Sequence, residues 1–164
     1  MALISNLYPP IMSDSLPAVN RSISDNGCRI YFSLSKYNSK EDIQYIQLSL
    51  INQKTNGSAL HERYKSGIKL YFFATDTDKK DEYNHYITIQ KSDLKNGQLE
   101  ADTFYKIQLR LVAKGAKTID NTDLNPTADW LLSQQNYFSE WSKVCLIKGI
   151  DEPVLSLKTF GSFE

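Results

Sequence analysis

The chain of 164 residues has only two cysteines, no excess of charge of either sign and no long apolar run. Two cysteines are too few for a Cys₄ zinc site or a disulfide scaffold. The 19 basic and 19 acidic side chains cancel, so no long-range field attracts nucleic-acid phosphates. No stretch reaches the roughly 20 apolar residues that span a bilayer. We therefore expect a single soluble domain whose partners include neither nucleic acid nor a membrane.

Two further features concern the compartment. The first ten residues lack the basic region and the apolar stretch of a signal peptide, so export by that route is not expected. Cys28 and Cys145 lie inside apolar runs, where a reduced thiol behaves as a small hydrophobe. We expect both thiols to be free and buried, because cysteine favours protein interiors.

Alternation of apolar and polar side chains is the dominant pattern that is present. Apolar residues recur at every second position from Cys28 to Leu34 and from Tyr105 to Ala113, the period of a half-buried strand. Shorter segments with strand character cover residues 46–50, 68–73, 86–89 and 141–148. Residues 68–73 and 144–147 are apolar on both faces, which predicts strands that are covered on both sides.

One helix interrupts these strands. Asn125 is a suitable cap and Pro126 a suitable first residue, which predicts a helix over residues 126–134. Its expected buried face consists of Ala128, Leu131 and Leu132. Short strands, polar turns and a single inserted helix predict an all-β fold, an antiparallel β-sandwich over residues 27–150.

The two ends of the chain are expected to lie outside this sandwich. Residues 1–26 contain three prolines and predict an extended N-terminal arm. The pattern does not decide between a flexible arm and a segment docked along a sheet edge. Residues 151–164 are expected to form a C-terminal extension or linker.

The stretch from Leu99 to Ala113 resembles part of a fibronectin type III domain, with a leucine, a turn and Tyr105 at the start of a long alternating strand. Residues 138–147 look like the last strand of that family, and residues 151–155 look like its proline-led link to a following domain. The resemblance implies an immunoglobulin/fibronectin type III-like sandwich. It also implies a tyrosine corner, in which the Tyr105 hydroxyl bonds to main chain a few residues upstream.

A second resemblance concerns residues 30–38 and 137–147, which are similar in character to structural proteins of tailed bacteriophages. It implies a virion component of the tail or head-tail connector, assembled in the cytoplasm of the bacterial host. Its implied partners are other virion structural proteins and copies of the same chain.

The sequence contains only incomplete versions of catalytic and metal-binding motifs. His61 and Glu62 begin like a zinc-protease helix, but no second histidine follows four residues after the first. His61 and His85 are the only imidazoles, and we interpret both as solvated residues in or beside loops. Acidic residues gather in two polar stretches, but without the spacing of a calcium loop or a glycosidase pair: Asp76, Asp78, Asp81 and Glu82, and Asp120, Asp123 and Asp129. The chain is therefore predicted to be no enzyme and to bind no metal or cofactor.

The aromatic residues provide the candidate binding surface. Trp130 lies off the apolar face of the predicted helix and, with Tyr137 and Phe138, forms a candidate anchor for a protein partner or a stacking surface for sugar. The alternative is that the helix folds down and buries Trp130. Trp141 is expected to stack on Arg110 of the neighbouring strand, a structural cation–π contact.

These features predict a non-enzymatic phage structural protein that assembles by sandwich packing and arm exchange. Exposed sheet edges pair readily with a neighbour's extended segment. The alternative function is a carbohydrate-binding or host-adhesion module, with a possible glycan partner stacked on the aromatic residues Trp130, Tyr137, Tyr64 and Tyr83.

Overall fold

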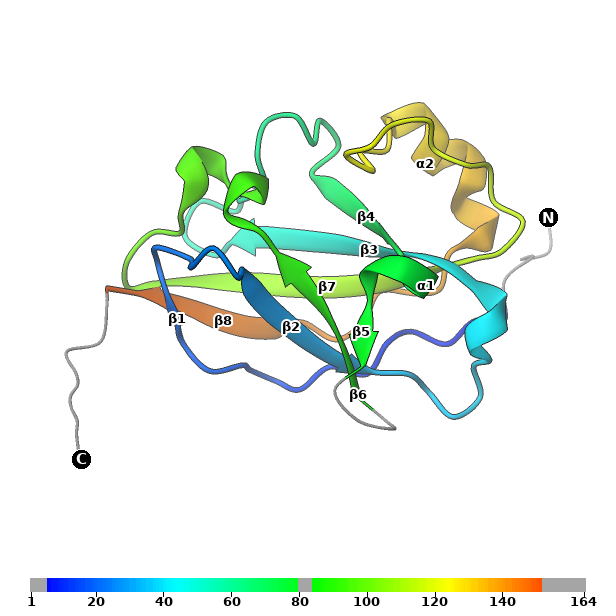
Figure 1. Cartoon of the computed structure of the whole chain (residues 1–164), viewed down its shortest axis with the longest axis horizontal. Coiled ribbons are helices and arrows are strands. Elements are labelled where there is room, and N and C mark those ends of the chain that lie inside the picture. The colour runs from blue at the N-terminus through cyan, green and yellow to red at the C-terminus, as the bar shows by residue number, and fades with distance from the viewer. Residues whose placement is uncertain (1–5, 80–83, 152–164) are drawn as a thin grey trace.

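The computed structural model describes residues 6–79 and 84–151 (Figure 1). Strands account for 37% of the chain and helical turns for 16%, which confirms the all-β class. The predicted C-terminal extension from residue 152 onward lies outside the described residues, as do Asp81, Glu82 and Tyr83.

The larger of two sheets has five strands in the order β1-β8-β7-β3-β4. Their bounds are Val19–Asn20 for β1, Cys145–Ile150 for β8, Thr103–Ala113 for β7, Ile43–Asn52 for β3 and Ile68–Phe72 for β4. Among the described strands of this sheet, only the β1–β8 pair is parallel. The sheet is therefore mixed rather than wholly antiparallel.

The smaller sheet has the order β2-β6-β5, with β2 at Cys28–Ser33, β6 at Asn84–Ile89 and β5 at Asp78–Lys79. Its strands cross in front of the larger sheet in Figure 1. Inward side chains of both sheets belong to one core cluster, including Ile30 and Ile87 of the smaller sheet and Leu48 and Ile107 of the larger. The period of two predicted for β2 and β7 is confirmed, because every second residue is buried.

Two α-helices and four 3₁₀ turns connect the described strands. They are α1 at Phe73–Asp76, α2 at Ala128–Gln134, and the turns η1 Lys40–Asp42, η2 Lys91–Asp93, η3 Lys95–Gly97 and η4 Gln135–Tyr137. The strand predicted to reach residue 73 ends one residue earlier, where α1 begins. Within the described residues, none of the helices has the length and apolar character needed to cross a membrane.

The predicted start of α2 was wrong by two residues. Thr127 caps the helix, because its hydroxyl accepts a hydrogen bond from the Trp130 N–H at 3.1 Å. The Asn125 side chain is occupied elsewhere, since its amide donates to the main-chain carbonyl of Arg63. Long-range bonding therefore moved the cap away from Asn125.

A second, smaller cluster lies on the outer face of the larger sheet, where residues 116–138 fold back over β3, β4 and β7. Its buried members are Tyr45, Leu70, Val112, Ala116, Leu124 and Phe138. β4 thus buries side chains on both faces, as predicted, with Tyr71 in the main core and Leu70 in the outer cluster. The same prediction for residues 144–147 was wrong, because β8 buries only alternate residues and Val144 is 39% exposed.

The N-terminal segment docks along the sheet edges in its described part. Ile11 and Ser33 of β2 exchange main-chain hydrogen bonds of 2.8 and 2.9 Å. Further along, the Leu16 N–H donates to the Leu146 carbonyl at 2.9 Å, and β1 follows in parallel beside β8. The segment therefore bonds first to the smaller sheet and then to the larger one.

Candidate functional site

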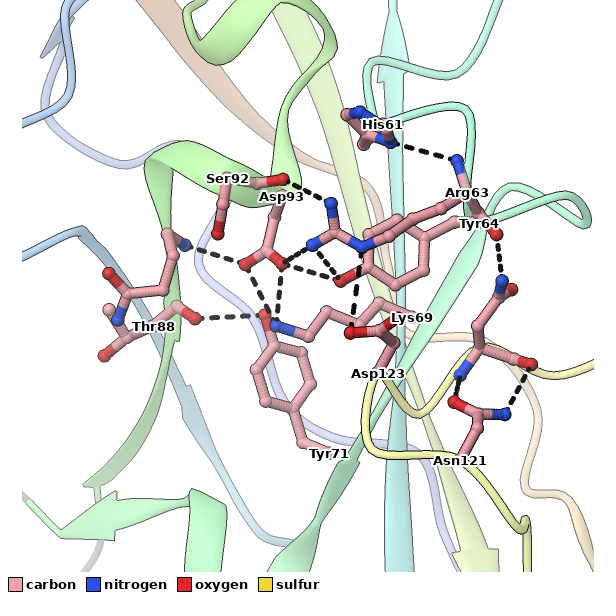
Figure 2. A network of polar contacts seen from close by, with 12 residues as sticks. His61, Arg63, Tyr64, Lys69, Tyr71, Thr88, Ser92, Asp93, Asn121 and Asp123 are labelled. Carbon is pink, nitrogen blue, oxygen red and sulfur yellow. Dashed lines mark hydrogen bonds and ion pairs between the residues drawn. The ribbon is translucent and has the colours of Figure 1, made fainter.

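A buried polar network around Asp93 is the strongest candidate site in the fold (Figure 2). Asp93 follows β6 on the turn η2, where a capping box joins it to Gln90. The Gln90 N–H donates to Asp93 Oδ2 at 2.8 Å, a bond local in sequence that orients the carboxylate. Only 2% of Asp93 is exposed, so its charge needs partners inside the protein.

Three side chains supply those partners from the segment before and within β4. Lys69 Nζ lies 3.0 Å from Oδ1 and 2.9 Å from Oδ2, and the Tyr64 hydroxyl donates to Oδ1 at 2.7 Å. Arg63 Nη2 lies 3.3 Å from Oδ1. Each carboxylate oxygen therefore accepts at least two hydrogen bonds.

The tyrosines of the network are held in the neutral form. Burial, together with the hydrogen bond to Asp93, raises the pKa of Tyr64 above its ordinary value. Burial also raises the pKa of Tyr71 well above its usual range, and its hydroxyl donates to the Thr88 carbonyl at 3.0 Å. Neither phenol is suited to act as a base at neutral pH.

Arg63 forms the rim of the network. Its Nη1 donates to the Ser92 carbonyl at 2.8 Å, and its Nε lies 4.0 Å from the exposed Asp123 carboxylate. A surface pocket of about 450 Å³ borders Arg63, Asp93 and Asp123. Because the charged groups are already paired with one another, the arrangement ties β4 to the loop after β6 and offers no unpaired base or nucleophile.

The two histidines lie in different parts of the fold, His61 in the connection between β3 and β4 and His85 within β6. His61 is exposed, and its Nδ1 accepts a hydrogen bond from the Arg63 N–H at 3.0 Å. His85 is only 5% exposed and lies within β6, with its ring 5.7 Å from that of Phe32 and 5.9 Å from that of Phe73. The interpretation of His85 as a solvated loop residue was therefore wrong, because the period of β6 turns it inward.

The described acidic side chains do not form a metal-binding group. Asp76 and Asp123 border the Asp93 pocket, whereas Asp120 and Asp129 are exposed on and before α2. Among residues 6–79 and 84–151, no three histidine, cysteine or carboxylate side chains come together as a metal site would require. That the chain binds no metal or cofactor stays a prediction.

The predicted anchor residues Trp130, Tyr137 and Phe138 come together, but around the outer cluster. The Trp130 ring lies 6.0 Å from that of Phe138 and 6.1 Å from that of Tyr45, edge-on at 81°. Its indole N–H donates to the Lys117 carbonyl at 3.0 Å. Trp130 is half-buried and Tyr137 packs against the same cluster.

The predicted buried face of α2 was right for Leu131 and wrong for Ala128 and Leu132. Ala128 is exposed and Leu132 is 68% exposed, whereas Trp130 and Leu131 pack onto the sheet. The helix is rotated because the indole ring fills the space above Tyr45 that a leucine would leave open.

The residues predicted to have structural roles are Arg110, Trp141 and Tyr105. Arg110 and Trp141 are in contact, and Tyr105 makes the hydrogen bond expected of a tyrosine corner. The Arg110 guanidinium is 4.1 Å from the Trp141 ring centroid and 4.4 Å from that of Phe138. It also donates to Gln47 Oε1 at 2.9 and 2.6 Å, and burial lowers its pKa to about 10, so it stays charged at neutral pH. The Tyr105 hydroxyl accepts a hydrogen bond of 2.8 Å from the Glu100 N–H, five residues upstream.

Sequence reasoning missed the Asp93 network, although one signal was available. Lys69 is the only charged residue in the apolar stretch 68–73, which was expected to be covered on both faces. A lysine is almost never fully buried without a partner, so that position predicts a buried acid. The sequence itself matches no protein-family model and no curated protein.

Proposed function

We propose that this chain is a non-enzymatic structural protein of a tailed-phage virion. In this proposal an immunoglobulin/fibronectin type III-like sandwich assembles into the tail or the head-tail connector, through sheet packing and exchange of the N-terminal arm. The main support for this mode of assembly is that residues 11–21 form main-chain hydrogen bonds with both sheets.

The strand order supports an immunoglobulin-like sandwich. In that fold strands A, B, E and D form one sheet and strands C, F and G form the other. Assigning B to G along this chain gives B-E-D for β2-β6-β5 and G-F-C for β8-β7-β3, with β4 as an added strand beside C. Ile11 then occupies the A position beside β2.

The corner at Tyr105 supports the same assignment. In immunoglobulin-type domains the corner tyrosine opens strand F, and a disulfide cysteine follows two residues later in antibody domains. Tyr105 lies at the start of β7 and bonds to Glu100. Ile107 occupies the cysteine position and is fully buried, so apolar packing replaces the disulfide.

The way in which the N-terminal segment is held supports the proposed arm exchange. Met12 and Ile23 bury their side chains in the main core, and the hydrogen bonds that join Ile11, Leu16 and the Arg21 N–H to the two sheets are main-chain to main-chain. Main-chain bonds do not depend on which copy of the chain supplies the segment. Exchange of an identical element between copies therefore costs little and joins neighbouring subunits.

The test places a disulfide across the arm contact. Ile11→Cys and Ser33→Cys face each other in a hydrogen-bonded pair, a geometry that a disulfide can span. We expect the concentrated, oxidised double variant to form a ladder of covalent oligomers on a non-reducing denaturing gel. The single variant Ile11→Cys is the control and should stop at a dimer. Exclusively intrachain disulfides in a monomeric protein would refute arm exchange.

Carbohydrate binding is the second candidate, and one surface feature favours it. The exposed rings of Tyr8 and Tyr37 lie 5.3 Å apart, and reciprocal hydrogen bonds of 2.9 and 2.8 Å between Tyr8 main chain and the Asn38 amide hold them in place. Aromatic surfaces of this kind stack on sugars. Strong signals on a glycan array that disappear with Tyr37→Ala, in a protein without oligomers, would favour this candidate.

The phage assignment rests on the resemblance of residues 30–38 and 137–147. The DNA that flanks the gene tests it directly. Portal, terminase or tail-tube genes beside the coding sequence are expected, and a neighbourhood of metabolic genes would contradict the assignment.

A further inference from the structure

One end of the larger sheet leaves a basic and apolar surface open. Phe104 and Lys106 of β7 point away from the main core, as do Leu146 and Lys148 of β8. Phe104 is 43% exposed, and Lys148 Nζ lies 5.4 Å from its ring centroid. We call these four residues the basic face.

The outer layer of the fold does not reach the basic face. Residues 116–138 pack over Tyr45, Leu70 and Val112, at the opposite end of β7. Among the described residues, no carboxylate forms an ion pair with Lys106 or Lys148. The basic face therefore has charge and apolar area that remain unmatched within the chain.

A surface of the opposite chemistry lies on and before α2. Asp129 and Leu132 are three residues apart and share the outer side of the helix. Leu132 is 68% exposed, and Asp120 and Asp129 are exposed without an ion pair among the described residues. We call Asp129 and Leu132 the acidic end; Asp120 is a further exposed carboxylate in the segment that leads to the helix. Figure 1 shows α2 far along the molecule's long axis from the point where β8 ends.

We propose that the basic face of one copy binds the acidic end of the next copy. Each surface combines an apolar side chain with charge. Lysines accompany Phe104 on the basic face, and a carboxylate accompanies Leu132 on the acidic end. The formal net charge of zero means that two copies do not repel each other at long range. A second copy is therefore the occupant that the chain's own charges favour.

The geometry of this contact is head-to-tail. Two different surfaces of one chain bind each other, so every added copy exposes a fresh surface for the next one. Such contacts produce rings when the rotation closes and filaments when it does not. Symmetric pairing of two basic faces is disfavoured, because it would bring lysines together. The inference rests on the proposed assembly function and names the surfaces it would use.

The test exchanges charges between the two surfaces. Lys148→Glu reverses the charge beside Phe104, and Asp129→Lys reverses the charge beside Leu132, so each variant has like charges at the contact with its own copies and is not expected to bind itself. We expect each reversal to weaken self-association about tenfold in sedimentation experiments. An equimolar mixture of the two should regain wild-type association, because each altered surface finds a complementary partner. Lys95→Glu, on an exposed lysine outside both surfaces, is the matched control.

The mixture makes the result independent of folding defects. Restored association requires two folded variants and opposite charges at the same contact. A mixture no better than its components, or an equal loss with Lys95→Glu, would overturn the proposal. The two proposals can fail separately. If the Ile11→Cys, Ser33→Cys variant forms covalent oligomers but the mixture of charge variants does not regain association, the proposed assembly function is retained and the contact between these two surfaces is refuted.

Discussion

Asp93 shows at the scale of a residue how a buried charge joins distant parts of the chain. Its carboxylate is fixed locally by Gln90 and then contacts Lys69, Tyr64 and Arg63 from other segments. Removing one partner of a buried ion pair leaves the other charge without compensation, which costs far more than the pair itself contributes. The network is therefore a structural connection between β4 and the loop after β6.

The first prediction concerns this residue. Asp93→Ala is expected to lower the free energy of unfolding by about 3 to 5 kcal/mol, because Lys69 keeps a largely buried charge without a partner. Asp123→Ala is the control and should cost less than about 1 kcal/mol, since its pairing with Arg63 is exposed. Urea denaturation followed by tryptophan fluorescence measures both. Equal losses would contradict a structural role for the buried network.

At the scale of an element, α2 illustrates how a helix serves as a cover for a sheet. The helix has seven residues, so it depends on its Thr127 cap and on packing rather than on intrinsic helix propensity. Trp130 contributes to that packing through ring contacts with Tyr45 and Phe138. The large indole is thus used to hold the outer layer against β3.

The second prediction compares two residues of α2. Trp130→Ala should lower the free energy of unfolding by about 2 to 3 kcal/mol, because the ring leaves a cavity over Tyr45. Leu132→Ala should change it by less than about 0.5 kcal/mol in dilute solution, because that side chain is 68% exposed. Chemical denaturation of both variants measures the difference. The reverse order of effects would mean that α2 packs by its other face.

At the scale of the whole molecule, one core lies between the two sheets and contains ionisable groups that stay neutral. Cys28 and Tyr71 contribute side chains to that core from different sheets. Burial raises the pKa of the Cys28 thiol from 9.0 to about 11, and it raises the pKa of Tyr71 as well. Folding therefore favours the protonated form of each group.

The third prediction is a loss of stability in alkaline solution. Below pH 9.0 the Cys28 thiol is protonated in both states, so its contribution to stability is complete. Between pH 9.0 and about 11 the unfolded chain releases the proton while the folded chain retains it, so stability falls across that range. Urea midpoints measured across this range should decrease, and Cys28→Ala should make the decrease less steep. A flat profile in the wild type would contradict burial of the thiol.

The sequence by itself determined most of the strands and their inward residues. Alternation identifies which side of a strand is apolar, because successive side chains point to opposite faces whatever the neighbouring strand is. The resemblance of residues 99–113 implied a bond between main chain and the Tyr105 hydroxyl, which the Glu100 N–H supplies, and the expected pairing of strands implied the stacking of Arg110 on Trp141. These contacts join residues close in sequence or expected on adjacent strands.

Only the tertiary structure decided what covers the outer face of the larger sheet, which side of α2 packs, and how Asp93 meets Lys69. Gln47 illustrates the limit: its polar side chain on an alternating strand is fully buried, because residues distant in sequence fold over it. The docking of residues 11–21 was open for the same reason. Its hydrogen bonds to Ser33 and Leu146 depend on the relative positions of the edges of two sheets. The local periodicity of the sequence does not predict those positions.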